Sequence, residues 1–158
     1  MPVALAAALI ATGCVRSDAE PVERYVGLEL HVGEFSRVPA APGQRAWAVA
    51  DGRSVHLAHA LTIPGEQIGR IEPTLDGDVP GLAFMLSDEI APQVEAVTTR
   101  NVGRAMGLVA GGELLSVATV SAPFASSFLT HVDSQAQAEA LVRRLTVDAP
   151  RAPDAATP

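Results

Sequence analysis

Glycine is concentrated in the stretch TTRNVGRAMGLVAGG, at Gly103, Gly107, Gly111 and Gly112. Glycine-rich loops can hold a phosphate with their main-chain N–H groups, but the known patterns lie between a strand and a helix or end in a lysine. Here the glycines follow an expected helix and precede expected strands, and the chain contains no lysine. The pattern therefore favours a helix end at Gly103 and a hairpin turn at Gly111-Gly112, with no nucleotide or other cofactor.

Histidine occurs in two patterns that could belong to a metal site or to a catalytic site. His56 and His59 lie three residues apart in an apolar run. Residues at that spacing on a strand face opposite sides, so we expect partly exposed strand histidines and no metal site. His131 and Asp133 lie among serines, which a small hydrolase could use, but the chain has no G-x-S-x-G motif. We expect turns and helix caps there, and hence no catalytic residues and no enzyme.

The charged residues exclude other classes of ligand. All eleven basic residues are arginine, and the formal net charge is −7. No basic run could neutralise a row of phosphates, so nucleic acid is not expected as a partner. Asp76 and Asp78 lack the twelve-residue pattern of a calcium loop and are expected in a hairpin turn. With 48% apolar and only 4% aromatic residues, the chain should form a globular core of small side chains.

The N-terminal stretch MPVALAAALIATGC is apolar and too short for an ordinary membrane-spanning helix. Its length and small residues fit the core of a secretory signal. The run IATGC resembles a bacterial lipobox, in which the cysteine after the glycine is lipidated. We therefore expect a signal and lipobox segment over 1–14, with a lipid anchor on Cys14. The alternatives are a cleaved signal with a chance cysteine and an apolar N-terminal helix.

The rest of the chain divides by composition. Residues 15–24 are predicted to be a tether, and residues 149–158, rich in proline and alanine, a disordered tail. A single folded domain is expected over 25–148. Within it, strands are predicted over 25–34, on both sides of Asp51-Gly52, and on both sides of the DGDV turn. Pro73 should make its strand an edge strand or an irregular one.

Two helices complete the expected fold. The first should begin at a cap on Ser87 or Asp88 and bury a stripe of Ile90, Val94 and Val97. The second, over DSQAQAEALVRRL, should be capped by Asp133 or Ser134. From residue 68 the order is strand, strand, helix, strand, strand, strand, helix. That order predicts an α+β fold, an antiparallel or mixed sheet with both helices packed on one face, in a ferredoxin-like layering.

The segment in which the first expected helix meets the following strands also resembles a known family. VTTRNVGRAMGLVAGGELLSVATV is similar to the periplasmic head subdomain of SecD and SecDF, accessory subunits of the bacterial Sec translocase. That family shows a helix ending in T-x-x-N-x-G, a strand, a turn ending in glycine, and a strand with a serine. The matching residues here are Thr98, Asn101, Gly103, Gly112 and Ser116, which we expect to be structural. The resemblance covers roughly 54–146, and the run LELHVGE extends it to residue 28.

The resemblance implies a stand-alone, lipoprotein-like version of the head, exposed on the periplasmic side of the cell envelope and anchored through Cys14. A secreted or soluble periplasmic protein is the alternative location. Its function would be non-enzymatic, the binding of a polypeptide or of a partner related to protein export. A different possibility is a structural or assembly lipoprotein that binds one folded envelope partner, and a small hydrolase is a third.

Overall fold

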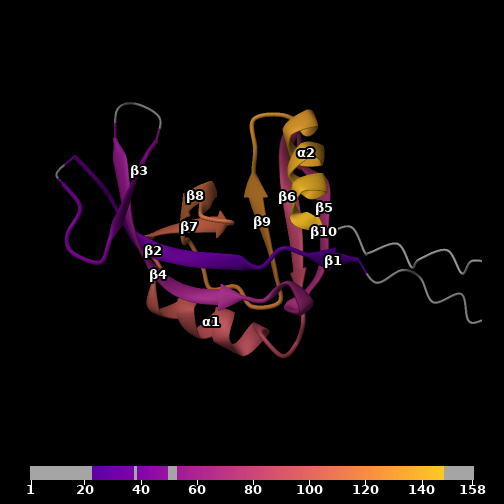
Figure 1. The fold of residues 1–158 in the computed structure, drawn as a ribbon, viewed down its shortest axis with the longest axis horizontal. Coiled ribbons are helices and arrows are strands. Elements are labelled where there is room, and N and C mark those ends of the chain that lie inside the picture. Colours follow the sequence, from indigo (N-terminus) through magenta and orange to yellow (C-terminus); the bar gives the residue numbers. More distant parts are fainter. Residues whose placement is uncertain (1–22, 38, 50–52, 148–158) are drawn as a thin grey trace, which may run out of the picture.

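The computed structural model describes residues 23–37, 39–49 and 53–147. The segment that contains Cys14 and the tail over 149–158 lie outside these residues. The described chain forms three antiparallel sheets and two α-helices (Figure 1). The α+β class with antiparallel strands is therefore confirmed.

The largest sheet has five strands in the order β3-β4-β2-β7-β8. Their bounds are β2 Leu28–Ser36, β3 Arg45–Ala48, β4 Ser54–Ile63, β7 Ala105–Ala110 and β8 Glu113–Thr119. Strands β3 and β4 pair antiparallel on either side of Asp51-Gly52, as the hairpin prediction requires, although those two residues themselves lie outside the described chain. Gly111 and Gly112 form the turn of the β7–β8 hairpin with φ angles of 57° and 81°. Residues with a Cβ atom rarely adopt such positive φ angles, whereas glycine does so readily.

A second sheet has three strands in the order β5-β6-β9. Its strands are β5 Ile68–Asp76, β6 Val79–Leu86 and β9 Ser127–His131. Asp76 and Asp78 flank the β5–β6 hairpin turn as expected, and Pro73 lies on edge strand β5. Figure 1 shows these strands running across the direction of β2 and β4.

The chain ends of the domain meet in a third, small sheet. It pairs β1 Arg24–Tyr25 with β10 Thr146–Val147. The 3-10 helix η2 Gly65–Gln67 lies next to β1 and joins β4 to β5. The N-terminal and C-terminal ends of the described domain therefore leave from the same side.

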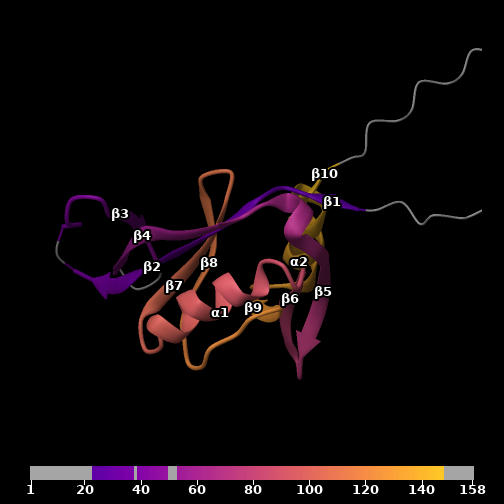
Figure 2. The same ribbon diagram turned by 90° about the horizontal axis from the view of Figure 1, so that it is seen from below.

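Each helix packs on a different sheet. Helix α1, Ala91–Arg100, lies against β4 of the five-stranded sheet (Figure 2). Helix α2, Gln135–Leu145, lies against β5 and β6 of the three-stranded sheet. The segment between β8 and β9 contains Pro123 and forms no hairpin, and β9 pairs with β6 of the other sheet. None of the helices in the described ranges is long and apolar enough to cross a bilayer.

The predicted start of α1 is wrong. Its N-cap is Ile90, which offers no side-chain hydrogen bond, and Pro92 lies in the first turn. The hydroxyl of Ser87 instead donates to the side chain of Gln67, and Ser87 lies three residues before the N-cap. The prediction for α2 is confirmed, because Ser134 Oγ accepts a hydrogen bond from the N–H of Gln137 at 3.2 Å.

One apolar core joins the two larger sheets and both helices. Leu28 and Leu30 come from the large sheet, Phe84 from the small one, Val94 from α1 and Leu141 from α2. The predicted stripe on α1 is confirmed at Ile90 and Val94, whereas Val97 is only partly buried. Because the sheets share this core, they form one folded unit.

A buried hydroxyl fixes the end of α1 to the segment that leads into β9. Thr98 is fully buried, and its Oγ1 accepts a hydrogen bond from the N–H of Phe124 at 3.1 Å. The same hydroxyl lies 2.9 Å from the carbonyl oxygen of Phe124 and 3.0 Å from that of Val94. A single side chain thus satisfies both main-chain groups of Phe124 inside the protein.

Replacing that hydroxyl should destabilise the fold. Thr98→Val keeps the shape of the side chain but removes the hydroxyl that bonds to the partly buried N–H and C=O of Phe124, at a cost of about 1 kcal/mol. Urea unfolding measures this cost. The matched control is Thr99→Val on the exposed side of the same helix turn, which should change the unfolding free energy by less than about 0.5 kcal/mol. Equal stability of the two variants would contradict the role of Thr98.

The single tyrosine provides a second test. Tyr25 is 4% exposed; its hydroxyl donates to Glu23 and accepts from the N–H of Ile71 at 3.2 Å. Burial, and then the hydrogen bond to Glu23, raise the pKa of Tyr25 above its usual value of 10. The neutral phenol therefore stabilises the fold fully below pH 10, and this contribution is lost as the pH rises through the folded-state pKa.

Because no other tyrosine absorbs, an ultraviolet titration reads this pKa directly. We expect a tyrosinate midpoint above 10 in the folded protein, and a lower midpoint in Glu23→Gln, which removes the negative charge. A folded-state midpoint at or below that of the urea-unfolded protein would show that Tyr25 is not held as described.

Candidate functional site

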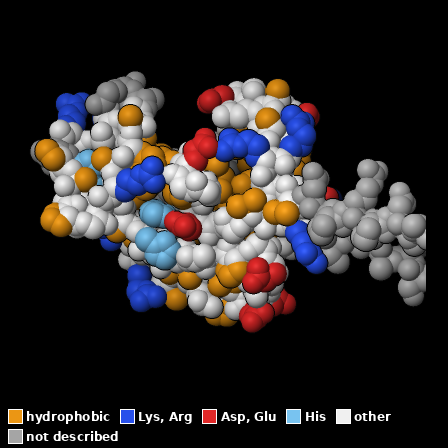
Figure 3. All heavy atoms as spheres, viewed as in Figure 1, with side chains coloured by type: hydrophobic (Ala, Val, Ile, Leu, Met, Phe, Trp, Pro, Cys, Tyr) orange, Lys and Arg blue, Asp and Glu red, His pale blue; other side chains and the backbone are white. Residues whose placement is uncertain are grey.

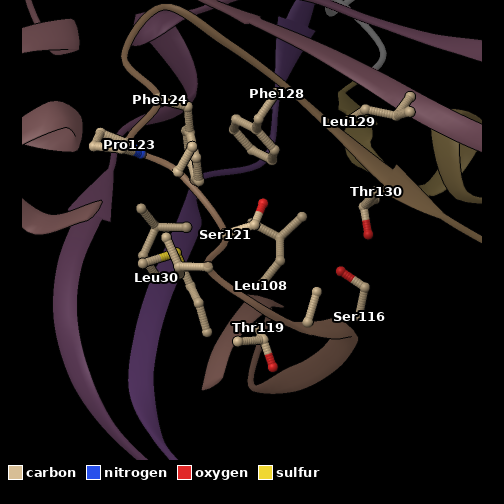
Figure 4. A pocket seen from close by; sticks show the side chains of 14 residues that line it. Leu30, Leu108, Ser116, Thr119, Ser121, Pro123, Phe124, Phe128, Leu129 and Thr130 are labelled. Atoms are coloured by element: carbon tan, nitrogen blue, oxygen red, sulfur yellow. The ribbon is translucent and has the colours of Figure 1, made fainter. Parts of the chain in front are cut away.

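An apolar hollow of the described chain lies between strands β8 and β9. It has a volume of about 360 Å³, and we call it the β8–β9 groove. Figure 3 shows hydrophobic side chains in the hollowed part of this face, and Figure 4 shows the groove from close by. The residues that line it come from β2, β7, β8, β9 and the segment between β8 and β9: Leu30, Met106, Leu108, Ser116, Ala118, Thr119, Val120, Ser121, Ala122, Pro123, Phe124, Phe128, Leu129 and Thr130.

The lining contains no charged side chain. The rings of Phe124 and Phe128 have centroids 5.0 Å apart, and Phe128 stacks on the buried Phe84 at 4.7 Å. Hydroxyl groups provide the polar part, and Figure 4 shows those of Ser116 and Thr130 turned toward each other across the groove. Such a surface can hold a ligand by apolar contact and by neutral hydrogen bonds, without recognising charge.

Both strands beside the groove are edge strands. Within the described residues, β8 pairs only with β7, and β9 pairs only with β6. An edge strand presents main-chain N–H and C=O groups that no neighbouring strand satisfies. The groove therefore has an apolar floor flanked by main-chain hydrogen-bonding groups.

The predicted family-motif residues lie around this groove, and most of them have structural contacts. Thr98 holds Phe124, which lines the groove. Asn101 ends α1 by donating from Nδ2 to the carbonyl of Val97 at 2.7 Å, and Gly103 follows with a φ of 83°. Ser116 itself lines the groove, whereas Gly112 lies in the hairpin turn that precedes it.

The expected histidine arrangement is only partly correct. His59 is exposed as expected, but His56 is 3% exposed, so the expectation of partial exposure is wrong for it. The reason is that β2 and β3 pair on both sides of His56, at Glu34 and at Ala46.

Sequence reasoning missed the contacts of His31. Its ring packs edge-to-face against Trp47 and His59, with centroids 5.6 and 5.4 Å away, and its Nε2 lies 2.7 Å from a carboxylate oxygen of Glu29. These residues come from three strands, so only the cross-strand register brings them together. No group of three possible metal ligands forms anywhere in the ranges that the structure describes.

The arrangement of His131, Asp133 and a serine that a small hydrolase could use is not formed in the described chain. His131 Nε2 lies 3.2 Å from a carboxylate oxygen of Asp76 on β5, with both side chains more than half exposed. Asp133 makes a different contact: its main-chain N–H donates to the side-chain oxygen of Gln137 at 2.8 Å. His131 is thus part of an exposed cross-sheet pair, and no serine hydroxyl bonds to it in the described chain.

Two solved structures share the fold. A structure of SecDF, a membrane component that enhances protein export, aligns with a TM-score of 0.54 at 13% identity, over 75% of this chain and 61% of that chain. A crystal structure of SecDF in the super-membrane-facing form aligns with a TM-score of 0.53 at 14% identity, over 80% of this chain and 20% of that one. The present chain therefore spans less than two thirds of either relative.

The sequence itself matches a family model. The model describes the P1 head subdomain of SecDF and matches residues 42–149, which is more than half of the chain. No curated protein sequence matches the chain. The matched segment contains β4 to β10, both helices and every residue of the groove except Leu30. On this evidence of sequence and fold, the chain belongs to the SecDF P1 head subdomain family.

Proposed function

We propose that this protein is a non-enzymatic SecDF-head-like domain that binds unfolded or extended polypeptide during protein export. The observation that supports the proposal most directly is the uncharged β8–β9 groove between two strands whose outer edges are unpaired in the described chain. One of the solved relatives is a membrane component that enhances protein export, which gives the binding a biological setting.

The groove suits an extended chain for physical reasons. Every polypeptide carries main-chain donors and acceptors at regular intervals, which an open strand edge can satisfy whatever the sequence. The aromatic floor of Phe124 and Phe128 can accept apolar side chains that a folded client would bury. Because no charged group lines the groove, burying a charged client side chain there would be unfavourable. The combination favours apolar segments of many sequences over one defined ligand.

We further propose that the domain lies on the periplasmic side of the envelope, attached to a membrane by lipid on Cys14. Strand β1 pairs with β10, so the chain enters the described fold next to the place where it leaves it. The ten residues from Cys14 to Arg24 (24 − 14) can span at most about 33–36 Å when extended. A lipid-anchored domain would then bind polypeptide near the membrane surface.

A charge placed in the groove should weaken binding. The protein carrying Cys14→Ser is titrated with an unfolded secretory polypeptide, and the affinity is compared with that of a version that also carries Thr130→Asp. A carboxylate buried beside a bound apolar segment lacks a partner, so we expect at least about a tenfold loss, or roughly 1.4 kcal/mol.

Thr130→Val is the matched control, since it keeps the shape of the side chain and adds no charge. Its affinity should stay within about threefold of the parent. The proposal fails if the parent shows no binding at high micromolar polypeptide. Crosslinking in cells to one stoichiometric folded partner, rather than to many clients, would favour the assembly function instead.

The anchor has its own test. Cys14→Ser removes the only cysteine in the chain and hence the only lipidation site of this kind. We expect the variant to move from the membrane fraction to the soluble fraction of cells, because a single apolar segment this short does not span the bilayer. A neighbouring change, Thr12→Ser, should leave fractionation unchanged, and an equal membrane share for both variants would exclude the lipid anchor.

A further inference from the structure

Three of the four edges of the two larger sheets carry features that discourage an added strand. Natural edges are commonly protected by shortness, proline, bulges or charge. Strand β3 has only four residues, and its Arg45 lies over the Trp47 ring at 4.9 Å. Strand β5 contains Pro73, a register shift near its start and an ion pair between Arg70 and Glu72 at 2.9 Å.

Strand β8 is protected in a similar way. Its pairing with β7 is irregular between Leu108 and Val109. Its first residue, Glu113, pairs with Arg144 of α2 at 2.5 Å, which places charge beside the hairpin end of this edge. These features leave β9 as the exception.

Strand β9, Ser127–His131, is also short, and its last residue pairs with Asp76 at 3.2 Å, but it lacks the other protections. It contains no proline, aspartate, glutamate or arginine, and its pairing with β6 is regular over all five residues. Phe128, Leu129 and Thr130 all line the β8–β9 groove, and Leu129 is 41% exposed. An apolar, regular and uncharged edge is the kind that accepts another strand.

The register shows which main-chain groups of β9 are free. The N–H of Leu86 donates to the carbonyl of Ser126 at 2.7 Å, and the N–H of Val132 donates to Pro80 at 3.0 Å. Main-chain groups alternate in direction along an antiparallel strand, so the even-numbered residues from 126 to 132 face β6. The N–H and C=O groups of Ser127, Leu129 and His131 consequently face outward.

We propose that β9 is the edge to which a bound polypeptide adds as an extra strand, hydrogen-bonded to the main chain of Ser127, Leu129 and His131. The proposal rests on the polypeptide-binding function proposed above and specifies its site and its ligand. The ligand is an extended segment without charge on the side chains that enter the groove.

The added strand would also contact apolar side chains on the other face of β9. Its residues alternate between two faces, one toward Phe128 and Thr130 and the other toward Leu129. On the second face Leu129 lies beside Met85, which is 47% exposed and lies opposite Ser127 in the sheet. A bound strand would cover part of this surface, and cross-strand apolar pairs there would stabilise it.

Backbone-modified peptides test the edge directly. The probe is an eight-residue peptide of alternating threonine and valine with blocked ends, titrated against the protein carrying Cys14→Ser. Two versions carry N-methyl groups, one on every threonine and one on every valine. In a strand that pairs on one side, only alternate N–H groups face the partner. We therefore expect one version to lose at least tenfold in affinity and the other to bind within threefold of the unmodified peptide.

The outcomes separate the two proposals. If the unmodified peptide and an unfolded secretory polypeptide both fail to bind, the proposed function itself is wrong. If the peptide binds but both methylated versions bind equally well or equally poorly, the function stands and pairing with β9 is excluded.

A charge at the edge gives a second measurement on the protein. Leu129→Lys protects the β9 edge, and we expect at least fivefold weaker binding of the unmodified peptide. The control is Val79→Lys, at a similarly exposed site on β6 away from that edge, which should bind normally. Equal affinities of the two variants would overturn the assignment. The edge would instead bind a second copy of the protein if sedimentation shows a dimer that Leu129→Lys dissociates and that added peptide does not affect.

Discussion

The buried hydroxyl of Thr98 is the contact on which the groove depends. It binds both main-chain groups of Phe124 and so fixes the segment between β8 and β9 to the end of α1. That segment carries Phe124 into the lining and delivers the chain to β9. If this segment were free to move, Phe124 and Phe128 would not be held in the groove. The chain would also not be positioned for β9 to pair with β6.

The groove exists because large and small side chains are distributed unevenly. The chain has only four phenylalanines, and Phe84, Phe124 and Phe128 stack together at this place. The lining also contains small residues such as Ala118, Ser121 and Ala122, which fill less space than the aromatic rings. Protein cores normally close such gaps at high packing density, so an open apolar hollow is a feature that function can use.

The distribution of charge supports the same interpretation. The chain carries a net charge of −7, yet no charged side chain of the described residues lines the groove. Two of the described ion pairs lie at other strand edges, Arg70 with Glu72 on β5 and Arg144 with Glu113 at β8, and a third joins His131 at the end of β9 to Asp76. The groove lining and the part of β9 from Ser127 to Thr130 carry no charged side chain, so charge protects that part of the edge least.

The sequence by itself determined the local structure and the family. Gly111-Gly112 needed positive φ angles, Ser134 offered a helix cap, and the spacing around Thr98, Asn101 and Gly103 pointed to the SecDF head. Each of these depends on neighbours along the chain, which sequence patterns record. The start of α1 was missed because Ser87 bonds to Gln67, twenty residues away.

The groove, the burial of His56, the contacts of His31 and the open edge of β9 were decided by tertiary structure alone. They depend on which strands pair and in which register, and the segment around Pro123 gives no signal in the sequence that β9 will join β6. Strand pairing is set by the free energy of the whole core, because many alternative pairings satisfy the same local pattern.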